Sequence, residues 1–132
     1  PSSNRGVFVL RNGGFPERTL VNERALAEEC VSRGFELVDP ERSSFERIRD
    51  ALHDAPIVVG VEGSALVHAV MLMPASSSLV TLQPPRRFNN VLKDYTDCIG
   101  QRYAFTVGDP AGQGFELPSQ RLWHLIERLE RA

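Results

Sequence analysis

Short apolar runs alternate with amphipathic stretches along the chain, and turn residues separate them. A short run without polar interruption is typical of a strand that is buried on both faces of a parallel sheet. We therefore predict five strands, at residues 6–10, 35–38, 57–60, 78–82 and 103–107.

Between these runs, apolar residues recur at helical spacing, which predicts helices at 23–33, 45–54, 65–72, 91–99 and 119–131. Asn22 is expected to cap the first helix and Gly34 to end it in the left-handed conformation. The segment Ser43–Glu46 has the form of a capping box. The helix at 65–72 is apolar on all sides, so we expect it to be buried, and residues 108–110 are expected to form a turn.

Alternating strands and helices predict an α/β fold with a mainly parallel five-stranded sheet between two layers of helices, a Rossmann-like or flavodoxin-like three-layer sandwich. With strand order 2-1-3-4-5, the winding direction reverses between the first and third strands. Ligands of such sheets bind in that crevice, beyond the carboxyl ends of the strands.

The 132 residues suit one domain, residues 1–132. The first strand begins almost at the amino terminus with no initiator methionine, so we expect a domain excised from a longer protein. A net charge of −2 offers no basic stripe for nucleic acid, and no apolar run is long enough for a membrane span in this segment. Cys30 and Cys98 lack the spacing of a zinc site or disulfide framework, which favours a reducing, cytoplasmic location.

Residues 56–68 combine an apolar strand, a glycine-spaced turn and an apolar helix. The first amides of a helix carry partial positive charge and lack partners within the helix, so the amides of Gly63, Ser64, Ala65 and Leu66 form a candidate phosphate site. Gly60 and Gly63 would permit a tight turn and close ligand approach, or they serve packing alone. The spacing matches neither the dinucleotide fingerprint nor the nucleotide-triphosphate loop.

Arg11 follows the first strand directly, and Arg18 lies beyond a Gly-Gly-Phe-Pro loop. Two guanidiniums near a helix amino terminus would clamp a diphosphate, since their paired donors match phosphate oxygens. Alternatively, both are solvated loop arginines, or one of them pairs with Glu17 or Glu23.

Glu62 would repel a diphosphate, so it either faces sugar hydroxyls, acts as a general base, or is a solvent-facing loop residue. For His68 a hydrogen-bonded core position is favoured over a site role. The loop at 83–90 combines Arg86, Arg87 and Asn89 with prolines and an aromatic residue, which suits recognition of a base or sugar, although an ordinary surface loop has the same composition. Trp123 fills the edge of the core or marks a surface for a missing domain.

Taken in order, Arg11, the segment Arg18–Glu23, the segment Gly34–Glu36 and the segment Ile57–Leu66 resemble the carboxyl-terminal half of glycosyltransferase family 61. That family includes capsular-polysaccharide biosynthesis proteins and eukaryotic sugar transferases. The resemblance covers residues 6 to about 83. Glu62 stands where the family usually has histidine, and Ser64 and Ala65 replace its alanine and small residue.

The resemblance implies a two-domain transferase of the GT-B type, with this chain as the half that binds a nucleotide-diphosphate sugar in polysaccharide biosynthesis. A missing amino-terminal domain would contribute much of the site for the glycan acceptor. Arg11 and Arg18 match the family's basic positions, and Gly60, Gly63, Ala65 and Leu66 match its glycine segment. The resemblance implies no metal or other cofactor, and Glu62 is the only candidate base within the chain.

Two other functions remain open. A non-catalytic flavodoxin-like module would bind a small ligand or partner protein through the same rim, because fold alone does not fix function. A degenerate transferase half would act as a scaffold, which the change at Glu62 would favour.

Overall fold

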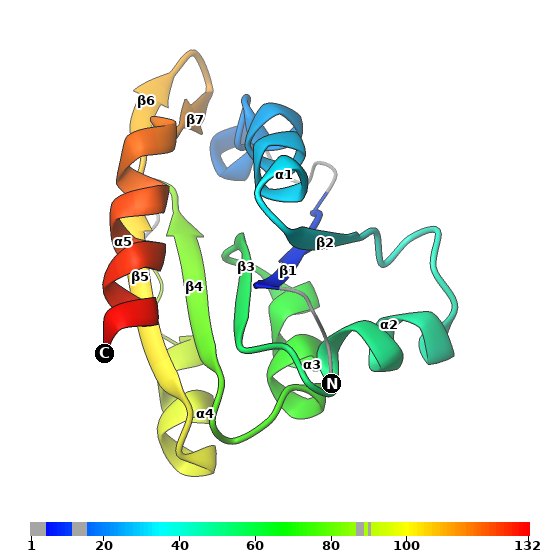
Figure 1. The fold of residues 1–132 in the computed structure, drawn as a ribbon. Coiled ribbons are helices and arrows are strands. Elements are labelled where there is room, and N and C mark those ends of the chain that lie inside the picture. Colours follow the sequence, from blue (N-terminus) through cyan, green and yellow to red (C-terminus); the bar gives the residue numbers. More distant parts are fainter. Residues whose placement is uncertain (1–4, 12–15, 87–88, 90) are drawn as a thin grey trace.

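The computed structural model of the protein describes residues 5–11, 16–86, 89 and 91–132 (Figure 1). The main strands are β1 (Gly6–Val9), β2 (Phe35–Val38), β3 (Ile57–Val61), β4 (Ser78–Gln83) and β5 (Arg102–Val107). The helices are α1 (Glu23–Ser32), α2 (Phe45–Leu52), α3 (Ser64–Leu72), α4 (Val91–Ile99) and α5 (Ser119–Arg131), with a short 3-10 helix η1 (Pro16–Arg18). Each predicted strand and helix is therefore confirmed to within a few residues.

The five strands form one parallel sheet in the order β2-β1-β3-β4-β5. Val9 pairs with Gly60 where β1 and β3 end, so these two neighbouring strands finish at the same edge of the sheet. The order confirms the predicted flavodoxin-like topology and places the reversal of winding between β1 and β3.

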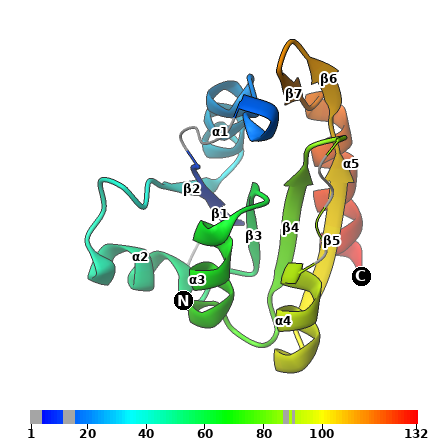
Figure 2. The same cartoon turned by 180° about the vertical axis from the view of Figure 1, so that it is seen from behind.

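Helices cover both faces of the sheet, as Figures 1 and 2 show from opposite sides. One apolar cluster joins the sheet to α1 and α5 through buried residues that include Leu26, Leu122 and Ile126. A second cluster joins the other face to α2, α3 and α4, with Leu52, Leu66 and Leu92 among its members. The sheet is thus the middle layer of a three-layer sandwich.

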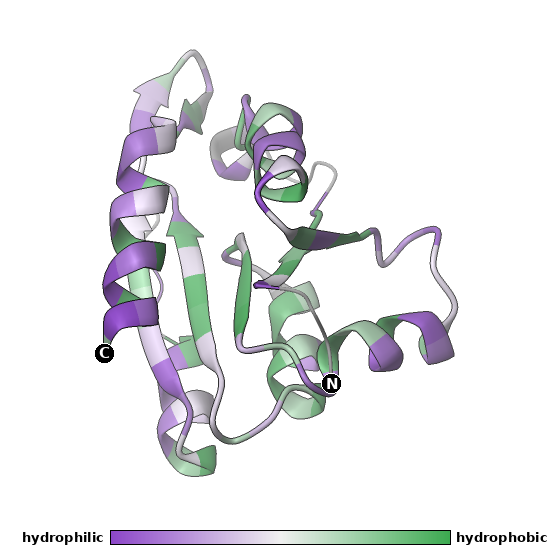
Figure 3. Ribbon diagram, in the orientation of Figure 1, coloured by the Kyte–Doolittle hydropathy of each residue, from purple (hydrophilic) through white to green (hydrophobic). Residues whose placement is uncertain are grey.

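The expectation that α3 is buried on all sides is wrong. Leu66, Ala69 and Val70 face the core, but Met71 is 70% exposed and His68 is also exposed. Figure 3 shows α3 as apolar over most of its surface, whereas α5 is largely hydrophilic. An exposed apolar side of α3 is therefore left next to α2.

The chain after β5 forms a hairpin of β6 (Asp109–Ala111) and β7 (Gly114–Glu116), where only a turn was predicted. Two residues connect these strands, and Gly112 has a φ of 60°, a value that glycine adopts without strain. Phe115 on β7 forms a parallel bridge with Leu20, so the hairpin packs against the segment that precedes α1.

Several local predictions have clear outcomes. Gly34 has a φ of 100°, as expected for the residue after a helix. The capping side chain of α2 is Ser44, whose hydroxyl accepts from the backbone amide of Arg47. Asn22 is the N-cap residue of α1, as predicted, but its side chain makes no capping hydrogen bond. Trp123 lies at the edge of the core, 4% exposed and in edge contact with Phe35.

Candidate active site at the ends of β1 and β3

Arg11 connects the two strand ends that flank the reversal of winding. Its guanidinium donates to the backbone carbonyl oxygen of Arg18 at 3.1 Å and to that of Glu62 at 3.4 Å. It also lies across Gly63, where a Cβ atom added to the glycine would be 3.4 Å from Arg11 Nε. The structure thus brings together residues that are far apart in sequence, at the edge where ligands of this fold class bind.

The charge of Arg11 is only partly hydrated, because the residue is half-buried. Burial lowers the pKa of its guanidinium, and the nearby cation of Arg18 lowers it further, while Glu62 and Glu23 raise it. The guanidinium still stays charged at neutral pH. The charges of Arg11 and Arg18 repel each other, so an anion bound near both would reduce this repulsion.

Neither conformation nor space requires a glycine before α3, because a Cβ at Gly63 would make only ordinary van der Waals contact with Arg11. Gly63 has a φ of 162° and a ψ of 177°, which is extended backbone that any residue adopts. The amide of Leu66 donates to the carbonyl of Gly63 at 3.1 Å, so this amide is engaged in the first turn of the helix. Of the predicted phosphate-binding amides, those of Gly63, Ser64 and Ala65 remain candidates.

Gly60 and Leu66 serve packing, which was one of the two interpretations of the glycine turn. Gly60 lies within β3, and a Cβ there would be 2.8 Å from Leu66 Cδ2 and 3.1 Å from the Val9 carbonyl oxygen. Leu66 is 1% exposed. Glycine at this position lets α3 approach the sheet closely, and the buried Leu66 side chain does not face a ligand.

Glu62 is a buried residue, 8% exposed, and the solvent-facing interpretation is wrong. Its backbone amide donates to the carbonyl of Leu82 at 3.1 Å, which extends the pairing of β3 with β4. Its carboxylate favours the charged form of Arg11 electrostatically. The candidate site therefore contains a buried anion beside its main cation.

The carboxyl-terminal hairpin fixes the segment that carries Arg18. The amide of Phe115 donates to the carbonyl of Thr19 at 2.9 Å, and the amide of Val21 donates to the carbonyl of Phe115 at 2.8 Å. Asn22 adds a two-point clamp on Leu117: Nδ2 donates to its carbonyl at 2.8 Å, and Oδ1 accepts from its amide at 3.1 Å. We conclude that Asn22 is a positioning residue, a role that the sequence analysis missed because it assigned this side chain to capping.

Glu23 holds the loop after β1. Its Oε2 accepts from the backbone amide of Arg11 at 2.8 Å. Pairing of Glu23 with one of the arginines was one of the alternatives predicted from the sequence, and this bond joins Glu23 to the backbone of Arg11. The sequence signal for this contact is an acidic residue in the first turn of α1.

The loop after β4 is organised by Gln83, which is fully buried. Its Nε2 donates to the carbonyl of Asn89 at 2.8 Å, and its Oε1 accepts from the Asn89 amide at 3.2 Å. Asn89 Oδ1 in turn accepts from the amide of Val91 at 2.8 Å, at the start of α4. The Asn89 side-chain oxygen is therefore engaged within the protein. Arg86 is exposed, and Arg87 lies outside the described residues.

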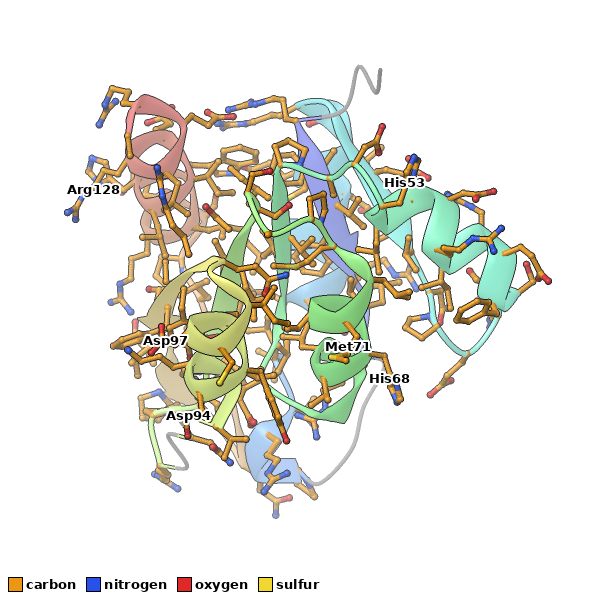
Figure 4. The ribbon with its side chains drawn as sticks, turned by 90° about the horizontal axis from the view of Figure 1, so that it is seen from below. His53, His68, Met71, Asp94, Asp97 and Arg128 are labelled. Carbon is orange, nitrogen blue, oxygen red and sulfur yellow. The ribbon has the colours of Figure 1, made fainter. Side chains whose placement is uncertain are left out.

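His68 points away from the core, as Figure 4 shows, so the predicted core position is wrong. Within the described ranges, no group of three or more histidine, cysteine, aspartate or glutamate side chains is arranged to hold a metal ion. In the same residues, no helix is both long and apolar enough to cross a membrane.

Comparison with known proteins identifies a family and a fold. The model of a family described as Glycosyltransferase 61 matches residues 1–80. A search of curated proteins found no match.

Two solved structures from cyanobacteria share the fold. The flavodoxin-like domain of a Synechococcus sp. protein is 15% identical, with a TM-score of 0.56 over 93% of this chain and 90% of that one. Diflavin flavoprotein A3 from Nostoc sp. is 14% identical, with a TM-score of 0.58 over 98% of this chain and 89% of that one. At such low identity the likeness concerns the fold alone.

Proposed function

The chain belongs to glycosyltransferase family 61, and from this premise we propose that it binds the nucleotide-diphosphate sugar donor of a transferase that builds polysaccharide. The observation that carries the proposal is the position of Arg11. Its half-buried guanidinium lies across the start of α3 and within the electrostatic field of Arg18. A diphosphate bound there would interact with both cations and with the first amides of the helix.

The reaction proposed is transfer of the sugar to a hydroxyl of a glycan acceptor. The acceptor oxygen forms a bond to the anomeric carbon as the bond from that carbon to the diphosphate oxygen breaks. The leaving nucleoside diphosphate takes the bonding electrons, and the arginines and helix amides stabilise its charge. The acceptor proton passes to a general base, for which Glu62 is the candidate in this chain. The proposal needs no metal, because fixed cationic groups stabilise the leaving group.

The proposed enzyme is of the GT-B type, with this chain as its carboxyl-terminal donor half and an amino-terminal domain at the acceptor side. We propose that the enzyme acts in the cytoplasm, with nucleotide sugars as its donor substrates. Of the residues predicted for the donor, Arg11, Arg18, Gly63, Ser64 and Ala65 remain as its diphosphate site. Arg86 and Arg87 remain as contacts for the sugar.

An amide NMR titration with UDP, GDP and CDP, followed by their sugar conjugates, tests donor binding. We expect dose-dependent shifts at Arg11, Gly63 and Ala65. Replacing Arg11 with glutamine removes a charge-assisted contact, typically about 1.5–3 kcal/mol, so the Kd should rise roughly 10- to 100-fold.

Arg131→Gln is the matched control. Arg131 is exposed in the last turn of α5, and its replacement removes the same charge far from the candidate site (Figure 1). Equal weakening by both substitutions would indicate a response to net charge and would contradict the site. No binding at millimolar ligand would reject donor binding by this chain.

A further inference from the structure

A pocket of about 370 Å³ lies between α2 and α3 on one face of the sheet. Val9, Leu52 and Ala69, all buried, form its inner part. Phe45 and Met71 also line it, and they are 61% and 70% exposed. The volume falls within the range of small-molecule sites, which is about 300–1,000 Å³.

The chemistry of the lining restricts what the pocket accepts. Nearly all of its side chains are apolar, and among the described residues that line it His68 alone has a polar ring. A sugar or phosphate would lose hydrogen bonds to water there without replacement. A flat ring can instead be held through its faces by Phe45 and Met71, with its polar edge toward the open mouth.

The pocket lies beside the candidate diphosphate site at Arg11, and both β1 and α3 connect the two. Val9 lines the pocket at the end of β1, and Arg11 follows two residues later, about 7 Å along an extended chain. Ala65 lines the pocket in the first turn of α3, directly after the Gly63–Ser64 start where Arg11 lies. α2 and α3 pack against the same face of the sheet, so the pocket and the start of α3 share one side of it.

We propose that the α2–α3 pocket receives the nucleobase of the nucleotide whose diphosphate lies at Arg11. This inference rests on the proposed function. The pocket holds the base through apolar contact, and its lining offers little hydrogen bonding to tell one base from another. UDP, CDP and GDP therefore bind with similar affinity, and specificity for the donor comes from other parts of the ligand.

Calorimetric titrations of the chain with inorganic pyrophosphate, UDP, CDP and GDP test the inference. UDP should bind more tightly than pyrophosphate, and the three nucleotides should agree within about fivefold. Phe45→Ala should weaken the binding of all three nucleotides roughly 5- to 100-fold, which is the usual range for loss of one aromatic stacking partner. It should leave pyrophosphate binding unchanged. Met71→Gln places a polar amide at the mouth of the pocket and should weaken nucleotide binding in the same way.

The matched control is Phe105→Ala, at a 45% exposed phenylalanine on β5 at the far edge of the sheet. Equal affinity of UDP and pyrophosphate would overturn the pocket while leaving the diphosphate site intact. So would nucleotide binding that Phe45→Ala does not change. Binding of UDP without pyrophosphate, lost in Phe45→Ala but kept in Arg11→Gln, would support the pocket and reject the candidate diphosphate site at Arg11. Absence of all binding would overturn both.

Discussion

Replacing Asn22 with alanine should destabilise the fold by detaching the segment before α1 from the hairpin. The side chain makes two hydrogen bonds to the backbone of Leu117, a residue with 0% exposure. Alanine leaves that amide and carbonyl without their partner, and each buried unsatisfied group costs about 1–3 kcal/mol. Some access of water to the gap reduces the sum, so we expect a loss of about 2–4 kcal/mol.

Equilibrium unfolding in urea measures this loss, with the fluorescence of the chain's one tryptophan, Trp123, as a probe of the buried core. With an m-value of about 2 kcal/mol/M, the midpoint should fall by about 1–2 M. Gln113→Ala, at an exposed residue in the connection of the same hairpin, serves as the control and should leave the midpoint unchanged. A shift below about 0.5 kcal/mol for Asn22→Ala would refute the clamp.

Four further outcomes follow from the structure. Gly60→Ala should lower the thermal midpoint, because the new Cβ would lie 2.8 Å from Leu66 Cδ2; an unchanged midpoint would contradict the packing role. A thiol reagent should modify exposed Cys98 in the native protein and Cys30 only after unfolding, since Cys30 is buried. Rapid reaction of two thiols per native chain would contradict this. Burial raises the pKa of Cys30 to about 12, so its thiol in the unfolded chain ionises first, and urea midpoints should fall as pH rises from about 9. Glu62→Gln should tighten pyrophosphate binding roughly tenfold in calorimetry by removing a nearby anion, and unchanged or weaker binding would show that the carboxylate does not face the ligand.

The sequence predicted the sheet well because each strand is a short apolar run flanked by turn residues, which is typical of strands in a parallel sheet covered on both faces. It also predicted that Arg11 and Gly63 meet, because both follow strands that end at the same edge. The prediction failed for one side of α3, because an apolar pattern does not show which elements cover a helix. His68 and Met71 lie on an apolar helix, yet α2 leaves their side uncovered.

The contacts that hold the loops of the site were beyond prediction for a different reason. Asn22 has the sequence context of a helix cap, and its side chain instead reaches the backbone of Leu117, 95 residues later. Gln83 is an ordinary polar residue at the end of a strand, but burial commits its amide to the backbone of Asn89. Such assignments depend on tertiary contacts that no local pattern encodes.

The division of the chain between matched and unmatched parts has a physical explanation. The family match ends at residue 80, and it includes Arg11, Arg18, Glu62 and the start of α3. The hairpin lies beyond the match, yet it holds the Arg18 segment through the backbone groups of Phe115 and Leu117. A backbone amide and carbonyl are the same for almost any residue. Side chains of the hairpin can therefore differ without loss of these backbone bonds, as long as the hairpin keeps its path.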